Sequence, residues 1–222
     1  MQALALLRVL QLFDSQFPVG AFAHSGGLET YGQAGSGLPT LREVMASQIA
    51  LGWGRGELAA ASLAWRAAGR RDEGATELSR LGALAGAVKV VPAVRETSLR
   101  LGRRTLILLK RLHPDIFAEV SMEHPHHAIV IGIAGRLLEL PLRELLLAYA
   151  HSLLAGALAA ATRCMPVSPA QAQELIVELQ PALVFAVERA MDATEDMLFT
   201  CTPALDIRCH QQGLLHTRLF QS

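Results

Sequence analysis

The sequence predicts an all-α fold, and three observations support this prediction. Apolar residues recur at helical spacing along most of the 222 residues, while clusters of Val, Ile and Thr are few. No alternating apolar and polar run is bounded by turn residues, so strand signals are nearly absent. Hydrophobic residues make up 51% of the chain, enough for one large core. We therefore expect a single domain over residues 1–222, a helical bundle of about ten helices with a C-terminal tail at 205–222.

The first half of the chain is expected to form short helices separated by turns. These helices are expected at residues 4–14, 28–31, 40–51, 57–68 and 75–84. The first has leucines at helical spacing, the second can be capped by Ser25 or Gly26, and the third starts at Thr40, where Glu43 completes a capping box. Residues 52–56 are rich in glycine and are interpreted as a turn between helices, and residues 70–73 form a charged turn.

Prolines mark most helix starts in the second half. Helices are expected at residues 92–112, 128–138, 141–165, 171–178 and 181–194, the last starting at Pro181. In the first of these, an apolar stripe carries Leu99, Gly102, Leu106 and Leu109, and the opposite face carries Arg100, Arg104 and Arg111. That basic face either is solvated or docks an acidic partner, and both interpretations remain open. The stretch from 202 to 222 has weak periodicity.

Composition and charge exclude several classes of protein. Lys and Arg together number 20, as do Asp and Glu, so the electrostatic basis for binding nucleic acid or an anionic membrane is missing. Three cysteines without a CxxC pair suit a reducing cytoplasm. A mean hydropathy of +0.32 at zero net charge indicates either a large core or surface that partners cover.

Two stretches resemble targeting or membrane segments without matching them. Ala21-Phe22-Ala23 has the small-x-small form of a cleavage site, but no Lys or Arg opens the chain and Arg8 splits the apolar run. Residues 145–161 reach only the lower end of the roughly 17 to 25 residues that span a membrane. They contain Tyr149 and His151, so we expect the central buried helix of the bundle and no transmembrane segment.

One alternative function is a serine hydrolase. Ser25 stands in a small-x-Ser-x-Gly context, and Asp206 and His216 follow it in the chain order of an α/β-hydrolase triad. That site needs a strand before the serine and a parallel sheet around it, and the sequence predicts neither. No P-loop motif is present either, so we expect no nucleotide binding through such a loop.

The candidate metal ligands are weakly arranged. Glu123, His124, His126 and His127 crowd around Pro125 without the helical spacing that a fixed site uses. Cys209 and His210 form a second pair that could hold Ni²⁺ or Zn²⁺ transiently. We therefore predict no metal site and no tightly bound cofactor.

Five stretches in register resemble the UreF family of urease accessory proteins over essentially the whole chain. The first is LQLFDSQFPVGAFAHSGGLE, residues 10–29. It is followed by Arg95-x-x-Ser98-x-x-x-Gly102-Arg103, by His126 with the apolar run to Gly132, by residues 140–166, and by the ending PALDIRCHQQGLLHTRLFQS. Three departures are Ser168-Pro169 in place of a Gly-Gln pair, Gln212-Gly213 in place of a His-Glu pair and His216 in place of a Tyr.

The resemblance implies an all-α protein without catalysis of its own. Members of the family join a UreD/UreH-type scaffold protein and the UreG GTPase on apo-urease, usually as a dimer of the whole assembly, and GTP hydrolysis accompanies nickel insertion. The complex, rather than this chain, is then expected to handle the nickel.

Carried over by position, the resemblance also implies twelve partner-binding residues. They are Gly20, His24, Ser25, Glu29, Arg95, Ser98, Gly102, Arg103, Asp206, Arg218, Leu219 and Phe220. His24, Ser25 and Glu29 either face a partner or hold their loop in shape. The tail is expected to be disordered alone and to fold on the scaffold, with packing onto its own helical core as the alternative.

Overall fold

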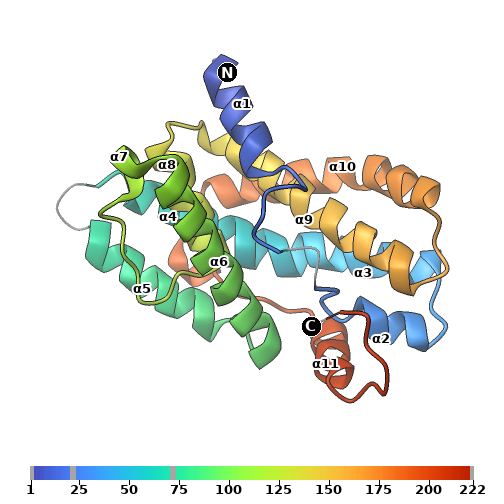
Figure 1. Ribbon diagram of the computed structural model, residues 1–222. Helices are drawn as coiled ribbons and strands as arrows, with labels where there is room; N and C mark the ends of the chain where they lie inside the picture. Colours follow the sequence, from blue (N-terminus) through green and yellow to red (C-terminus); the bar gives the residue numbers. More distant parts are fainter. Residues whose placement is uncertain (1–2, 21–23, 71–73, 221–222) are drawn as a thin grey trace.

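The computed structural model describes residues 3–20, 24–70 and 74–220, and every regular element within these ranges is a helix (Figure 1). The all-α prediction is therefore confirmed. In chain order the α-helices are α1 (Ala3–Leu12), α2 (Leu28–Gln33), α3 (Leu38–Ser47), α4 (Ala59–Ala67), α5 (Gly74–Ala87), α6 (Pro92–Leu112), α7 (Pro114–Phe117), α8 (His127–Leu137), α9 (Leu142–Cys164), α10 (Pro169–Met191) and α11 (Pro203–Gln212). A π-helix, η2 (Gln48–Leu58), joins α3 to α4, and a short 3-10 helix, η3 (Glu195–Met197), follows α10.

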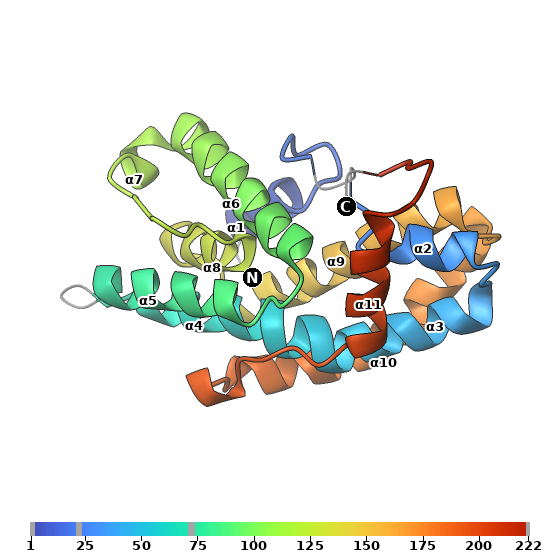
Figure 2. The same cartoon turned by 90° about the horizontal axis from the view of Figure 1, so that it is seen from below.

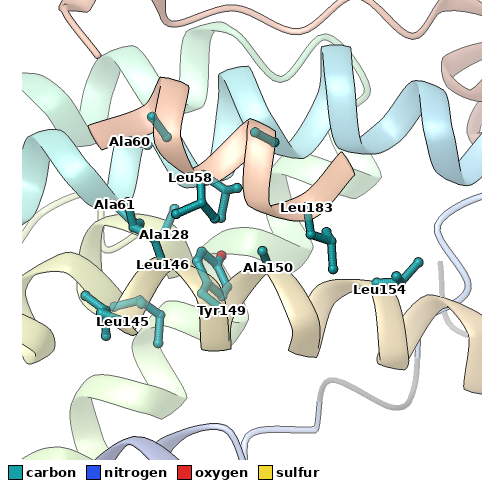
Figure 3. Close-up of a cluster of buried hydrophobic side chains, with 14 of the residues drawn as sticks. Leu58, Ala60, Ala61, Ala128, Leu145, Leu146, Tyr149, Ala150, Leu154 and Leu183 are labelled. Carbon is teal, nitrogen blue, oxygen red and sulfur yellow. The ribbon is translucent and has the colours of Figure 1, made fainter. Parts of the chain in front are cut away.

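The core lies where α9 meets η2, α4, α8 and α10 (Figure 3). Its side chains come from elements far apart in the sequence, such as Leu58, Leu145, Tyr149 and Leu183, and all are buried. Helices α4 and α8 can approach closely because Gly132 has no side chain. A Cβ at this position would overlap the carbonyl oxygen of Ala61. Burying each large apolar side chain contributes roughly 1.5 to 3 kcal/mol.

Helix α9 is long and apolar enough, by length and composition, to cross a membrane. Its most apolar 18-residue window has a mean hydropathy of 1.6, and 44% of that window is buried within the protein. The helix contacts α1, α2, η2, α8 and α10, and the carbonyl oxygen of Cys164 at its end lies against Gly32 of α2. The expected central position of this segment in the bundle is confirmed.

Two expectations in the first half are wrong. Residues 52–56 form part of the π-helix rather than a turn, and the glycines there serve close packing. A Cβ at Gly54 would lie 2.5 Å from the carbonyl oxygen of Ile49 and 3.3 Å from the Cβ of Ala186 on α10. The Thr40 capping box is absent, because α3 begins two residues earlier after an N-cap at Gly37. Ser168 and Gln171 form a capping box instead, at the start of α10.

Helix α10 runs through Pro181, where the sequence predicted a break. Proline removes one hydrogen bond to the residue four positions earlier, here Val177. Pro181 and Val177 both lie on the solvent side, so water can satisfy the freed carbonyl. Buried leucines on either side, Leu179 and Leu183, pack the helix onto the core and outweigh the local preference of proline.

The stretch expected to lack regular structure contains α11, which stands beside α2 (Figure 2). The remaining residues fold back over α2, so the expectation of a disordered tail is wrong in this structure. Two predicted features, the Ala21-Phe22-Ala23 stretch and positions 71–73 of the charged turn, lie outside the described residues.

Candidate functional site

The loop before α2 is held in shape by the protein itself. Gly20 has a φ of +82°, and a Cβ there would lie 2.6 Å from Nη1 of Arg104. That guanidinium donates a hydrogen bond to the carbonyl oxygen of Val19 at 3.3 Å. Burial, followed by the charges of Arg100 and Arg104, lowers the pKa of His24 to about 4. The described residues on either side of 21–23 therefore lie close to arginines of α6, and His24 is neutral near pH 7.

Gln212 at the end of α11 joins the loop to the C-terminal segment. Its Oε1 accepts hydrogen bonds from Ser25 Oγ and from the backbone N–H of Gly27, both at 3.0 Å. Its Nε2 donates to Oε2 of Glu29 at 3.2 Å. Ser25, Glu29 and Gln212 are all buried, and buried polar groups of this kind stabilise a fold only when they are paired.

Glu29 in turn fixes the backbone of the tail. Its two carboxylate oxygens accept hydrogen bonds from the N–H groups of Leu219 (2.6 Å) and Phe220 (3.4 Å). The ring of Phe220 is buried, with the guanidinium of Arg163 5.9 Å from its centroid, whereas Leu219 is 71% exposed. Of the two expectations for the tail, packing onto its own core is the one seen here. We call residues 213–220, held in this way, the clasped tail.

Beside the clasped tail lies a cleft of about 360 Å³. It is lined by Glu29, Gln33, Arg163, Cys164, Met165, Thr217, Arg218 and Leu219. Burial and the nearby Glu29 raise the pKa of the Cys164 thiol to about 11, so this thiol is not a reactive nucleophile at neutral pH. Arg163 and Arg218 make the cleft suited to an acidic or carbonyl group of a partner.

The hydrolase hypothesis is wrong. Ser25 is buried and donates its proton to the amide oxygen of Gln212, which cannot act as a base. His216 is exposed on the tail, and Asp206 lies on α11. No strand exists in the described ranges to build a nucleophile elbow or an oxyanion hole.

The predicted residues of the basic helix are divided between core and surface. Ser98 Oγ lies 3.2 Å from Nδ1 of His126 and accepts a hydrogen bond from the N–H of His127 at 3.3 Å, so it holds the start of α8. A Cβ at Gly102 would overlap the carbonyl oxygen of Pro125. Both residues are buried, Arg95 is partly buried, and Arg103 is the exposed member of the four.

Sequence reasoning missed a buried polar network in the core. Lys89 Nζ lies 2.8 Å from Oε1 of Glu57, and the hydroxyl of Tyr149 donates to Oε2 of Glu57 at 3.2 Å and lies 3.3 Å from Nδ1 of His127. Burial alone would raise the pKa of Glu57, but Lys89, His127 and Tyr149 outweigh it and lower that pKa. Burial lowers the pKa of His127 to about 4. The network joins η2, the segment before α6, α8 and α9, and is structural.

The candidate metal ligands do not converge. His126 pairs with Ser98, His127 pairs with Tyr149, and His124 lies 3.7 Å from the exposed Glu123. Burial raises the pKa of the Cys209 thiol to about 12, which makes it a poor ligand at neutral pH. Among the residues described here, no group of three or more His, Cys, Asp or Glu side chains is placed to hold a metal ion.

The structure thus brings Ser25, Glu29, Leu219 and Phe220 together and adds Gln212 and Arg163, which sequence reasoning did not select. Asp206 is partly buried on α11, and burial raises the pKa of its carboxyl group. In the described part of the chain, buried hydrogen bonds join a glycine-shaped loop, α11 and the clasped tail. The class that the fold and the site define is that of an all-α protein with a clasped C-terminal segment.

Comparisons with known proteins identify the family of this all-α protein. The pattern of the UreF family matches residues 38–180. The urease accessory protein UreF of Nostoc sp. (strain PCC 7120 / SAG 25.82 / UTEX 2576) is 30% identical over 220 residues, which cover 97% of this chain and 95% of the relative. The UreF protein of Haemophilus influenzae (strain PittEE) is 31% identical over 225 residues, covering 96% and 94%. That of Actinobacillus pleuropneumoniae serotype 3 (strain JL03) is 31% identical over 223 residues, covering 96% and 97%.

The chain belongs to the UreF family of urease accessory proteins. It is therefore a non-catalytic accessory protein of urease maturation. The resemblance noted in the sequence and the prediction that the chain is not an enzyme are both confirmed.

Proposed function

We propose that this chain joins a UreD/UreH-type scaffold protein and the UreG GTPase in the cytoplasm, so that GTP-dependent nickel insertion can take place on apo-urease. The clasped tail carries this proposal. Its backbone is fixed by Glu29, while two large apolar side chains point away from the protein: Leu214 is 83% exposed and Leu219 is 71% exposed. Burying each of them on a partner would contribute roughly 1.5 to 3 kcal/mol.

The clasp prepares this surface before the partner arrives. Because hydrogen bonds to Glu29 already order the backbone of residues 219 and 220, binding pays less conformational entropy than a disordered tail would require. Arg218 lies between the two exposed leucines in sequence order and lines the cleft, where its guanidinium is available to a carboxylate of the scaffold protein. The tail is thus a preformed docking element.

We test the tail with two substitutions on its exposed side, Leu214→Asp and Leu219→Asp. We expect affinity for the purified scaffold protein to fall by about a hundredfold, since two buried anchors worth about 1.5 kcal/mol each are lost. The far-ultraviolet circular dichroism should stay unchanged because neither side chain packs on the core. Val177→Asp on α10, where the valine is 65% exposed, is the control and should bind normally.

Unchanged affinity of the double variant, measured by isothermal calorimetry, would refute the docking role of the tail. Deleting residues 214–222 is a poorer test of this role. Deletion removes the Leu219 and Phe220 N–H groups that Glu29 binds, so it should lower the melting temperature as well as scaffold affinity.

We further propose that the chain forms a homodimer within the assembly through α1. This helix projects from one end of the molecule and buries only Val9 and Leu12 (Figure 1). Leu4, Leu7 and Leu10 are between 57% and 62% exposed along one ridge, at spacings typical of helix–helix contacts. A second copy of the same helix offers a matching apolar ridge, as a two-fold interface requires.

The dimer is tested with Leu7→Arg, measured by sedimentation of the assembled complex with its scaffold protein. We expect the wild-type complex to contain two copies of each chain and the variant complex to contain one, because two like charges would face each other across the axis. Val177→Arg on α10, where the valine is 65% exposed, is the matched control and should keep two copies. Two copies in the Leu7→Arg complex would place the dimer contact elsewhere.

A further inference from the structure

Helix α6 lies on an outer face of the molecule (Figure 2), and most of its charged residues are basic. Its sequence holds six basic residues and a single acidic one, Glu96, although the whole chain has no net charge. At 3.6 residues per turn, one face of the helix brings together Arg100, Arg103, Arg104, Ile107 and Arg111. We call these five residues the α6 basic face.

The charge on this face is not neutralised by acidic side chains among the described residues. None of the ion pairs between described residues involves an arginine of α6. Arg103, Arg104 and Arg111 are exposed, and Arg104 also donates a hydrogen bond to the carbonyl oxygen of Val19. Nε of Arg100 is buried and has no hydrogen-bond partner in the described part of the chain. The same guanidinium donates through Nη2 to Oγ1 of Thr97 at 3.4 Å, so Arg100 is held within the protein and the exposed arginines carry the accessible charge of the face.

Two further observations define the chemistry of that partner. Arg100 and Arg104 help to lower the pKa of His24, so the positive potential extends to the neighbouring loop. Ile107 lies in the middle of the face and is 61% exposed. An apolar centre surrounded by arginines matches an apolar side chain flanked by carboxylates. A phosphate backbone would pair with the arginines but leave Ile107 uncovered, which disfavours nucleic acid.

We propose that the α6 basic face docks an acidic amphipathic helix of a partner protein, whose carboxylates pair with Arg103 and Arg111 and whose apolar side chain covers Ile107. The inference rests on the proposed function only in that the partner is a member of the urease-maturation assembly. It is distinct from the clasped tail, since all five residues of the α6 basic face lie on α6.

The test is the double variant Arg103→Glu and Arg111→Glu, which spares Arg104 and its contact with the loop. Its affinity is measured separately for the purified scaffold protein and for the purified GTPase. We expect at least about a tenfold loss with one of them, because reversed charges repel carboxylates, and a smaller loss near 0.3 M salt, where exposed charges are screened. The control, Arg42→Glu with Arg143→Glu, makes the same charge change at two exposed ion pairs on other helices and should bind normally.

A second measurement identifies the contacted segment. Benzoylphenylalanine at position 107 of the otherwise wild-type chain is photo-crosslinked in the reconstituted assembly, with position 177 on α10 as the control. We expect the partner peptide joined to position 107 to carry several Asp or Glu residues at helical spacing. A crosslink to a neutral or basic peptide overturns the proposal, as does binding of a labelled RNA or DNA duplex that the double variant abolishes.

The outcomes also separate this inference from the proposed function. If the wild-type chain assembles and the double variant assembles equally well, the docking proposal is wrong while the function stands. If the wild-type chain binds neither the scaffold protein nor the GTPase, both proposals fail.

Discussion

At the scale of single residues, the side-chain amide of Gln212 can accept and donate hydrogen bonds at the same time, which a carboxylate or an ammonium group cannot. Gln212 accepts two hydrogen bonds through its oxygen and donates one through its nitrogen, so it satisfies Ser25, Gly27 and Glu29 together. The resemblance to the UreF family places a His at this position, and Gln212 stands there in this chain. The structure contains a full set of contacts because the glutamine supplies both donor and acceptor.

Gly102 and Gly156 provide a matched residue-scale prediction, since both lie inside long α-helices. A Cβ at Gly102 would overlap the carbonyl oxygen of Pro125, whereas nothing lies within 4 Å of one at Gly156. We expect Gly102→Ala to lower the free energy of unfolding by about 2 kcal/mol, because a backbone clash forces α6 away from the start of α8. Gly156→Ala should raise it by about 0.5 to 1 kcal/mol through helix propensity.

Urea denaturation of the two variants at one pH checks this prediction. A stable Gly102→Ala protein would mean that α6 can shift without cost, and Ser98 would then lose its role in holding α8.

At the scale of elements, sequence patterns predicted the helices well where amphipathicity and local signals agree. Helix α6 has the expected bounds, and α8 and α9 each begin within a residue of the expected start. The errors occur where tertiary packing overrides a local signal: glycines in η2, which allow α10 to approach, and Pro181 in α10. No one-dimensional pattern could reveal the clasp, because it joins Glu29 to residues 190 positions away.

Pro181 allows an element-scale prediction. Pro181→Ala restores the hydrogen bond to the Val177 carbonyl and removes the ring clash, which together cost about 3 kcal/mol in an ideal helix. Part of that gain is offset, since proline also restricts the unfolded chain. We expect a net stabilisation of about 1 kcal/mol by thermal unfolding. Pro169→Ala, at the first turn of the same helix, is the control and should not stabilise.

At the scale of the whole molecule, three histidines make stability depend on pH. Burial is the main cause that lowers the pKa of His24, His126 and His127 to about 4 in the folded protein. In the unfolded chain a histidine pKa lies near 6.5, so between about pH 6.5 and 4 the unfolded state binds more protons. The stability that these histidines provide is therefore complete above pH 6.5 and falls as the pH drops towards 4.

We expect the urea midpoint at pH 5 to be clearly lower than at pH 7.5, with the same dependence of free energy on urea concentration. Glu57 acts in the same direction at acid pH. Its pKa is lowered in the folded protein, so the ionised carboxylate stabilises the fold and this stabilisation is lost when Glu57 is protonated. His151→Gln is the control: this residue is exposed and does not contribute to the lowered pKa of the three histidines, so the pH profile should not change. A flat midpoint between pH 7.5 and 5 would contradict the buried, neutral state of these histidines.

The clasp has a consequence for synthesis of the chain on the ribosome. Domains fold from the N-terminus as they emerge, yet Glu29 of α2 has its hydrogen-bond partners at residues 212, 219 and 220. Until residues 212–220 have been translated, α2 is present without the groups that pair with its buried carboxylate. The clasp is thus among the later contacts to form, since long-range closures are slow. A nascent chain that stops before residue 219 lacks both hydrogen bonds from the tail backbone to Glu29.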